Sequence, residues 1–164
     1  SPARAAERLR HSWIGIDGDD TARATSRRIA GHLGARTLEI PPGRKSAYHA
    51  AAVLSSNFPV VLASIASDLL ASLGIPAKSA QQAVHGLMEG AVANLGDAAP
   101  DEVLTGPVVR GDLDAVMRHL ASLRDHPDAK AVYKRLSLAA LSIASERGTD
   151  PAKIEAMRKM LLLR

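Results

Sequence analysis

The stretch HSWIGIDGDDTARATSRRIAGHLGARTLEIPPG, residues 11–43, decides the fold of this chain. Its apolar run at Trp13, Ile14 and Ile16 is typical of a strand, and the turn that follows precedes a helix predicted over 21–33. A second short strand is predicted over 37–41, closed by the Pro-Pro-Gly turn. Strand, helix and strand within about 30 residues form a βαβ unit, which is normally part of a larger parallel sheet. Because two strands alone make a marginal sheet, we expect its neighbouring strands to lie outside this chain or to come from a partner.

From residue 43 onward the pattern is helical throughout. Further helices are predicted over 44–73, 80–95 (capped by Ser79), one turn at 101–104, then 112–123, 127–147 and 151–163. Pro59 lies inside the first of these and lacks a backbone N–H, so we expect a kink or a break near Asn57. The fold class is mainly α, with a βαβ part over 1–42 and a helical domain over 43–164. The residues of the long helix expected in the core are Val53, Leu54, Val60, Leu62, Ile65, Leu69 and Leu73.

Composition narrows the classes of protein. The 164 residues are 46% hydrophobic and only 2% aromatic, which favours closely packed helices built from alanine and leucine. The chain has no cysteine, which is natural for a cytoplasmic protein, and no apolar run that we expect to span a membrane. The formal charge of +4 is spread among acidic residues, without a basic run or stacking aromatics, so nucleic-acid binding is not expected. The histidines other than His49 are not spaced like metal ligands, so no metal site is predicted.

Polar residues at the start of the long helix form the first candidate site. Lys45 and His49 are four residues apart and therefore share one helix face, with Tyr48 close by and Asn57 expected on nearly the same stripe. A lysine, a histidine and an asparagine on one face can hold a polarised oxygen as cation, proton donor and orienting amide. The alternative from spacing alone is that Lys45 and Tyr48 are solvated and that Asn57 caps the proline kink.

A second candidate lies in the sequence TGPVVRGD, residues 105–112. Thr105 offers a hydroxyl and Arg110 a guanidinium near a helix start, groups that suit an anionic or hydroxylated ligand. The alternative is that Gly-Pro makes a turn and that Asp112 is a helix cap.

The order of these elements, with KSAYHAAAVLSSNF at 45–58 and EVLTGPVVRGDLDAVMRHLASL at 102–123, resembles the C-terminal part of a bacterial family of Rossmann-like oxidoreductases. Proteins of that family carry a helical domain similar to the C-terminal domain of 6-phosphogluconate dehydrogenase. The resemblance implies that residues 1–42 are the last part of a Rossmann-like domain and that 43–164 form a substrate and dimerisation domain. Lys45 matches a lysine of the wider superfamily, whereas His49 stands where related dehydrogenases carry asparagine.

The resemblance makes Lys45 and His49 candidate catalytic residues, and Tyr48, Asn57, Thr105 and Arg110 candidate contacts to a small-molecule substrate. NAD(P) is implied for the full-length protein. No G-x-G-x-x-G follows a strand, so this chain alone is expected neither to bind the dinucleotide nor to be active. Several helices are apolar on more than one face, and with the resemblance this predicts a homodimer through the helical domain. The alternative function is a non-catalytic helical dimerisation or scaffold module.

Overall fold

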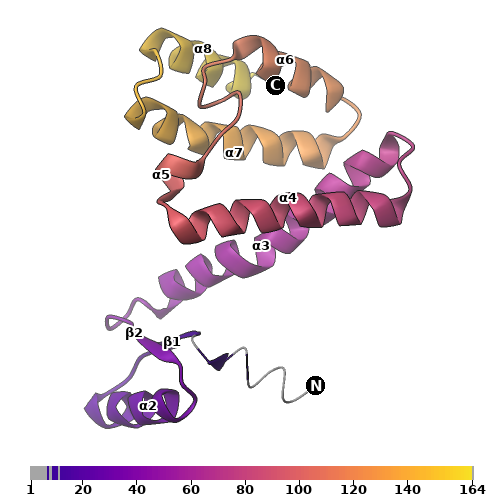
Figure 1. Ribbon diagram of the computed structural model, residues 1–164. Helices are drawn as coiled ribbons and strands as arrows, with labels where there is room; N and C mark the ends of the chain where they lie inside the picture. Colours follow the sequence, from indigo (N-terminus) through magenta and orange to yellow (C-terminus); the bar gives the residue numbers. More distant parts are fainter. Residues whose placement is uncertain (1–6, 8, 11, 164) are drawn as a thin grey trace. The chain divides into compact units, whose positions relative to one another are not determined.

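The computed structural model describes residues 7, 9–10 and 12–163 and confirms the predicted fold class, a short parallel strand pair followed by helices (Figure 1). The elements are β1 (Trp13–Ile16), α2 (Asp20–His32), β2 (Arg36–Glu39), α3 (Lys45–Ser72), α4 (Ala77–Asp97), α5 (Pro100–Val103), α6 (Leu113–Ser122), α7 (Pro127–Glu146) and α8 (Pro151–Leu162). The chain divides into two compact units, unit 1 over Ser1–Val60 and unit 2 over Val61–Arg164. Each unit is described by itself.

In unit 1, β1 and β2 pair in parallel and α2 makes the crossover between them. Trp13 lies opposite Arg36 in the register, and the Arg36 guanidinium stands 5.6 Å from the centre of the Trp13 ring. The predicted cap at the start of α2 is present, because the Asp19 carboxylate accepts a hydrogen bond from the Ala22 N–H at 2.8 Å. The buried apolar residues of this unit are Ile16 of β1, Ala30 of α2 and Ile40, which follows β2.

Helix α3 is continuous from Lys45 to Ser72 although Pro59 lies inside it, so the predicted break is not present. Helix α3 therefore begins in unit 1 and ends in unit 2. By length and composition this helix could also cross a membrane. This contradicts our expectation that the chain has no apolar run long enough to do so. A core helix of a protein passes the same test, so this property alone assigns no membrane contact.

The core prediction for α3 is wrong for three residues. Leu54, Val60 and Leu73 are 63%, 68% and 70% exposed. The remaining predicted core residues are half-buried, namely Val53, Leu62, Ile65 and Leu69. The physical reason is that the apolar pattern of α3 runs around much of its circumference, whereas the described part of the chain covers only one side.

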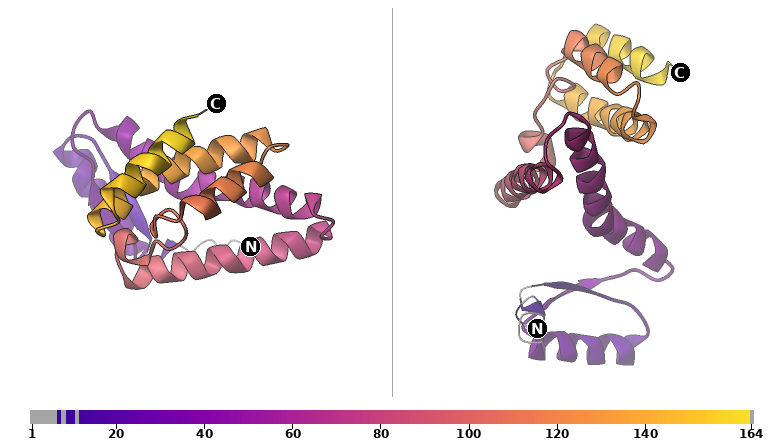
Figure 2. Two further views of the ribbon diagram at one scale, coloured as in Figure 1. Left: turned by 90° about the horizontal axis from the view of Figure 1, so that it is seen from above. Right: turned by 90° about the vertical axis from the view of Figure 1, so that its right-hand side faces the viewer.

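The core of unit 2 lies between α6, α7 and α8, which lie side by side in both views of Figure 2. Val116 of α6, Leu141 of α7, and Met157 and Leu161 of α8 are buried and in mutual contact. Partly buried residues, among them Tyr133, pack around this cluster. The close packing explains why the apolar residues of these three helices, rather than those of α3, form the interior.

In unit 2, two helix caps predicted from the sequence, Asp112 and Asp150, are confirmed, and one, Ser79, is wrong. Asp112 accepts a hydrogen bond from the Ala115 N–H at 2.9 Å, and Asp150 accepts one from the Ala152 N–H at 2.8 Å. Helix α4 begins at Ala77, with Pro76 in the N-cap position and no side-chain cap. Ser79 therefore lies inside the first turn rather than before it. The fixed φ of proline suits a helix start, and this signal outweighed the serine.

Candidate functional site

The start of α3 follows the carboxyl end of β2 after a short turn in which Gly43 has a φ of 73°. Lys45 and His49 are exposed there on one side of the first two turns, while Tyr48 is half-buried. In open α/β sheets, ligands bind beyond the carboxyl ends of the strands. The structure thus places the three first-turn candidates directly after that edge in the chain.

The Tyr48 ring packs against Gly15 in β1. A Cβ built on Gly15 would lie 2.5 Å from Tyr48 Cζ and 2.7 Å from its hydroxyl oxygen, closer than real Cβ contacts come. Only glycine leaves room for the ring in this position. Tyr48 therefore fixes the first turn of α3 on the strand, a packing role that the sequence did not indicate.

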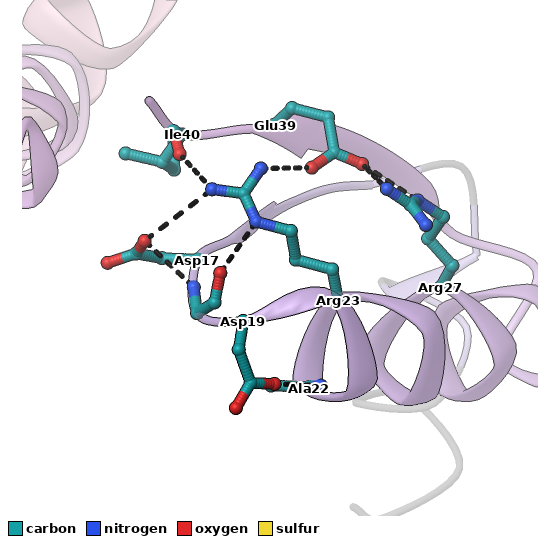
Figure 3. Close-up of polar contacts among 8 residues, drawn as sticks. Asp17, Asp19, Ala22, Arg23, Arg27, Glu39 and Ile40 are labelled. Carbon is teal, nitrogen blue, oxygen red and sulfur yellow. Dashed lines mark hydrogen bonds and ion pairs between the residues drawn. The ribbon is translucent and has the colours of Figure 1, made fainter. Parts of the chain in front are cut away.

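An arginine cluster at the carboxyl ends of both strands was missed by the sequence analysis (Figure 3). Arg23 of α2 donates to the Gly18 carbonyl at 2.7 Å, to the Glu39 carboxylate at 3.0 Å and to the Ile40 carbonyl at 3.1 Å. The Asp17 carboxylate lies 3.9 Å from the same guanidinium, whose side chain is only 18% exposed. Arg23 thus joins the carboxyl ends of β1 and β2, the second of which leads into α3.

Glu39 is held on both carboxylate oxygens, because Arg27 donates to its second oxygen at 2.8 Å (Figure 3). With both oxygens bound by arginines of α2, this carboxylate holds the crossover helix against the end of β2. The sequence signal that could have found the cluster is the pair of arginines one turn apart in the helix of a βαβ unit whose second strand ends in an acid.

Asn57 does not share the face of Lys45 and His49. Since α3 is one continuous helix, Asn57 lies about 80° around the axis from His49 and about 120° from Lys45, at 3.6 residues per turn. Its amide oxygen accepts a hydrogen bond from the Ser56 hydroxyl at 2.8 Å. The expectation of a single stripe is therefore wrong, and Asn57 borders the Lys45–His49 face at most.

Thr105 and Arg110 belong to the loop between α5 and α6 in unit 2. Two contacts anchor this loop: Arg147 donates to the Leu104 carbonyl, and the Thr149 hydroxyl donates to the Val109 carbonyl at 2.6 Å. Thr105 is exposed and borders two cavities, one of about 560 Å³ beside α4 and α5 and one of about 270 Å³ beside α6 and α7. Arg110 is exposed and lines neither of them.

The candidate residues thus fall into two groups. Lys45, Tyr48, His49 and Asn57 lie in unit 1, and Thr105 and Arg110 lie in unit 2. Within unit 1 the structure brings Lys45, Tyr48 and His49 together at the helix start. A shared role for the two groups stays a prediction.

Comparison with known proteins identifies the family. Residues 12–140 match the family described as "Domain of unknown function (DUF2520)". The structure is similar to that of the protein TM1727 from Thermotoga maritima, with a TM-score of 0.77 and 29% identity over 88% of this chain and 57% of that one. It is also similar in fold to the "putative NADP oxidoreductase BF3122" from Bacteroides fragilis, with a TM-score of 0.62 and 24% identity over 76% of this chain and 47% of that one.

The chain spans about half the length of these two solved structures. A search of curated proteins gave no match. The parallel βαβ unit followed by helices agrees with the last part of a Rossmann-type sheet joined to a helical domain, as in the oxidoreductase-like neighbour. On the match over 12–140, the chain belongs to the DUF2520 family.

Proposed function

We propose that the chain is the C-terminal portion of an NAD(P)-dependent oxidoreductase and supplies substrate contacts and a dimer interface. The observation that carries the proposal is the parallel strand pair, whose second strand leads at its carboxyl end into α3, where Lys45, Tyr48 and His49 begin the helix. The fold likeness to BF3122, of which this chain covers 47%, supports it.

The residues of this chain do not suit the dinucleotide itself. The turn after β1 holds a single glycine, and Asp19 and Asp20 stand at the N-terminus of α2, where a pyrophosphate would otherwise bind. Those carboxylates would repel it. The proposal therefore assigns NAD(P), which supplies a hydride when bound, to a lobe outside this chain.

Lys45 and His49 have the chemistry to complete a reduction of a carbonyl or an imine. The Lys45 ammonium would stabilise the negative charge that develops on the substrate heteroatom, and the His49 imidazolium would transfer a proton to it. Their spacing of one helical turn puts both side chains on one face, within reach of one small group. Tyr48 and Asn57, with Thr105 and Arg110 as second-rank candidates, would contact the remainder of the substrate.

The test uses the protein extended upstream through its dinucleotide-binding lobe, with NADPH oxidation measured against a panel of small carbonyl and imine compounds. Lys45→Ala and His49→Ala should each lower turnover about 10²–10⁴-fold, because general acid catalysis contributes that much. Both residues are exposed, so the melting temperature should not change. The matched controls are Lys78→Ala and His85→Ala, which remove an exposed cation and an exposed imidazole of α4.

Full activity in both variants would remove the catalytic assignment. It would leave the alternative, a non-catalytic dimerisation or scaffold module, which one observation also favours. Apolar residues of α3 and α4 are exposed, among them Leu54, Phe58, Val60, Val61, Leu87 and Val92. Helix α8 packs on α6 and α7, and it leaves these residues exposed.

We infer that a second copy of the chain covers these residues in a two-fold homodimer. Such an interface should bury more than about 1,200 Å². Light scattering over a range of micromolar concentrations tests this, since the monomer mass is 17.2 kDa. A mass that stays at this value would exclude the dimer, and a mass of twice this value would support it. A dimer whose Lys45 and His49 variants remain fully active would favour the scaffold module.

A further inference from the structure

A polar cluster in unit 2, which includes none of the proposed catalytic residues, lines the cavity of about 270 Å³ between the α5–α6 loop, α6 and α7. His119 comes from α6, Tyr133 and Ser137 come from α7, and Thr105 comes from the loop. The rest of the wall is apolar, with Pro107, Val108, Val109, Leu136 and Ala140 among its residues. A mostly apolar cavity with a few convergent polar groups is the usual form of a small-molecule site.

His119 and Tyr133 are held together in this wall. The His119 Nδ1 atom lies 2.9 Å from the Tyr133 hydroxyl oxygen, and the two rings meet edge to face with their centres 5.7 Å apart. Burial raises the pKa of the Tyr133 hydroxyl, and a hydrogen bond from Ser137 lowers it by less. The phenol therefore stays protonated at neutral pH and can donate its hydrogen to Nδ1 of the neutral imidazole.

This contact determines what the cluster presents to the cavity. With Nδ1 accepting from Tyr133, the proton of the neutral His119 ring is on Nε2, which is a donor. If the ring is protonated, Nδ1–H donates to the Tyr133 oxygen, and both Nε2–H and the phenol hydrogen become donors. In either state the pair offers hydrogen to a ligand, and the Thr105 hydroxyl can add a further donor.

The charge around the cavity is complementary to an acceptor. Among the described residues, no aspartate or glutamate lines it. The Arg147 guanidinium donates to the Leu104 carbonyl, in the residue before Thr105, and so places a positive charge at the wall. Donors together with a nearby cation are the groups that bind a carboxylate.

We propose that this cavity binds a small carboxylate with an apolar, branched body, the carboxylate oxygens accepting from His119 Nε2–H and Thr105 while the body contacts Val108 and Leu136. At about 270 Å³ the cavity is at the lower end of the range usual for ligand pockets, which favours a small molecule as the ligand. His119 and Thr105 would be binding residues, and Tyr133 a positioning residue that acts through His119. Only Thr105 is also a candidate contact in the proposed oxidoreductase site, so His119 and Tyr133 test the cavity independently of that assignment.

The test is a titration of the 164-residue chain with 3-methylbutanoate, followed by the NMR signals of the backbone amides and of the histidine rings. The amine of the same skeleton, 3-methylbutylamine, is the charge-reversed control probe. We expect saturable shifts at residues around Thr105, His119 and Tyr133 with the carboxylate and none with the amine. Equal shifts with both probes, or carboxylate shifts spread over the exposed His32 and His85 instead, would overturn the proposal.

Two variants complete the test. His119→Ala should weaken binding of the carboxylate about tenfold, as expected for the loss of a hydrogen bond to a charged group, whereas His85→Ala should not change it. Tyr133→Phe keeps the ring packed against the core but removes the hydroxyl. The preference of the His119 ring for the Nε2–H tautomer should then weaken toward that of a free imidazole, which its ring nitrogen shifts report directly. An unchanged tautomer in Tyr133→Phe, or an unchanged affinity in His119→Ala, would contradict the proposed role of that residue.

Discussion

Truncating a buried and an exposed leucine of unit 2 tests where its core lies. Leu141 of α7 is 1% exposed and touches Val116, Met157 and Leu161, whereas Leu87 of α4 is 74% exposed. Leu→Ala removes about three CH₂ equivalents at about 0.8 kcal/mol each, or about 2.4 kcal/mol for a fully buried side chain. The cavity left behind raises the cost for Leu141→Ala to about 3–5 kcal/mol. With about a quarter of its surface buried, Leu87→Ala should cost only about 0.6 kcal/mol.

The assay is equilibrium unfolding in urea followed by far-ultraviolet circular dichroism, which reports on the helices, at several protein concentrations. The change in the free energy of unfolding is taken from midpoints at constant slope. A loss below about 1 kcal/mol for Leu141→Ala would refute the reasoning from burial. So would a Leu87→Ala cost equal to that of Leu141→Ala in a chain that light scattering shows to be monomeric. A Leu87→Ala cost that grows with protein concentration would instead locate this residue in the dimer interface.

Three further outcomes follow from single contacts. Gly15→Ala should destabilise unit 1 by about 1–3 kcal/mol through its clash with the Tyr48 ring. Tyr48→Ala in the same chain should remove most of that clash, and additive losses of stability in the double-mutant cycle would contradict the contact. Asp112→Ala should lower the free energy of unfolding by about 1 kcal/mol through loss of the α6 cap, whereas Asp114→Ala, inside the helix, should lower it less. Equal urea midpoints for the two variants would show that the cap contributes nothing beyond an ordinary first-turn acid. Because the pKa of Tyr133 in the folded chain is raised above the ordinary 10.0, the unfolded chain loses this proton first. The stability should therefore fall as the pH rises from about 10 toward the folded pKa. Tyr133→Phe should abolish that part of the fall, and an unchanged profile of melting temperature against pH would contradict the reasoning.

Local sequence signals predicted the elements well, because each acts within a few residues. Asp112 and Asp150 precede helices whose first N–H groups they accept from, and Pro151 begins a helix where its missing donor costs nothing. The strands over Trp13–Ile16 and Arg36–Glu39 follow from short apolar runs between turn residues. The error at Ser79 was a choice between two local signals in the same turn.

Contacts between distant segments could not be predicted in this way. Nothing in the sequence near Gly15 indicates that the Tyr48 ring fills the space beside it, and Arg23 meets Glu39 only once the crossover brings the strands together. His119 and Tyr133 likewise meet because α6 and α7 belong to one core. The apolar residues of α3 were predicted to lie in the core of this chain, and three of them do not. An apolar pattern shows that a helix face must be covered, but it does not show whether the same chain or another one covers it.

The position of the one tryptophan has a practical consequence for spectroscopy. Trp13 is the only tryptophan of the chain, lies on β1 in unit 1 and is 60% exposed beneath the Arg36 guanidinium. Its intrinsic fluorescence therefore reports on the strand pair alone, while circular dichroism reports mainly on the helices. Unfolding curves from the two signals would coincide only if the two units melt together. An added sheet neighbour that covers Trp13 would shift its emission to shorter wavelength, so the chain carries its own optical probe for the completion of its sheet.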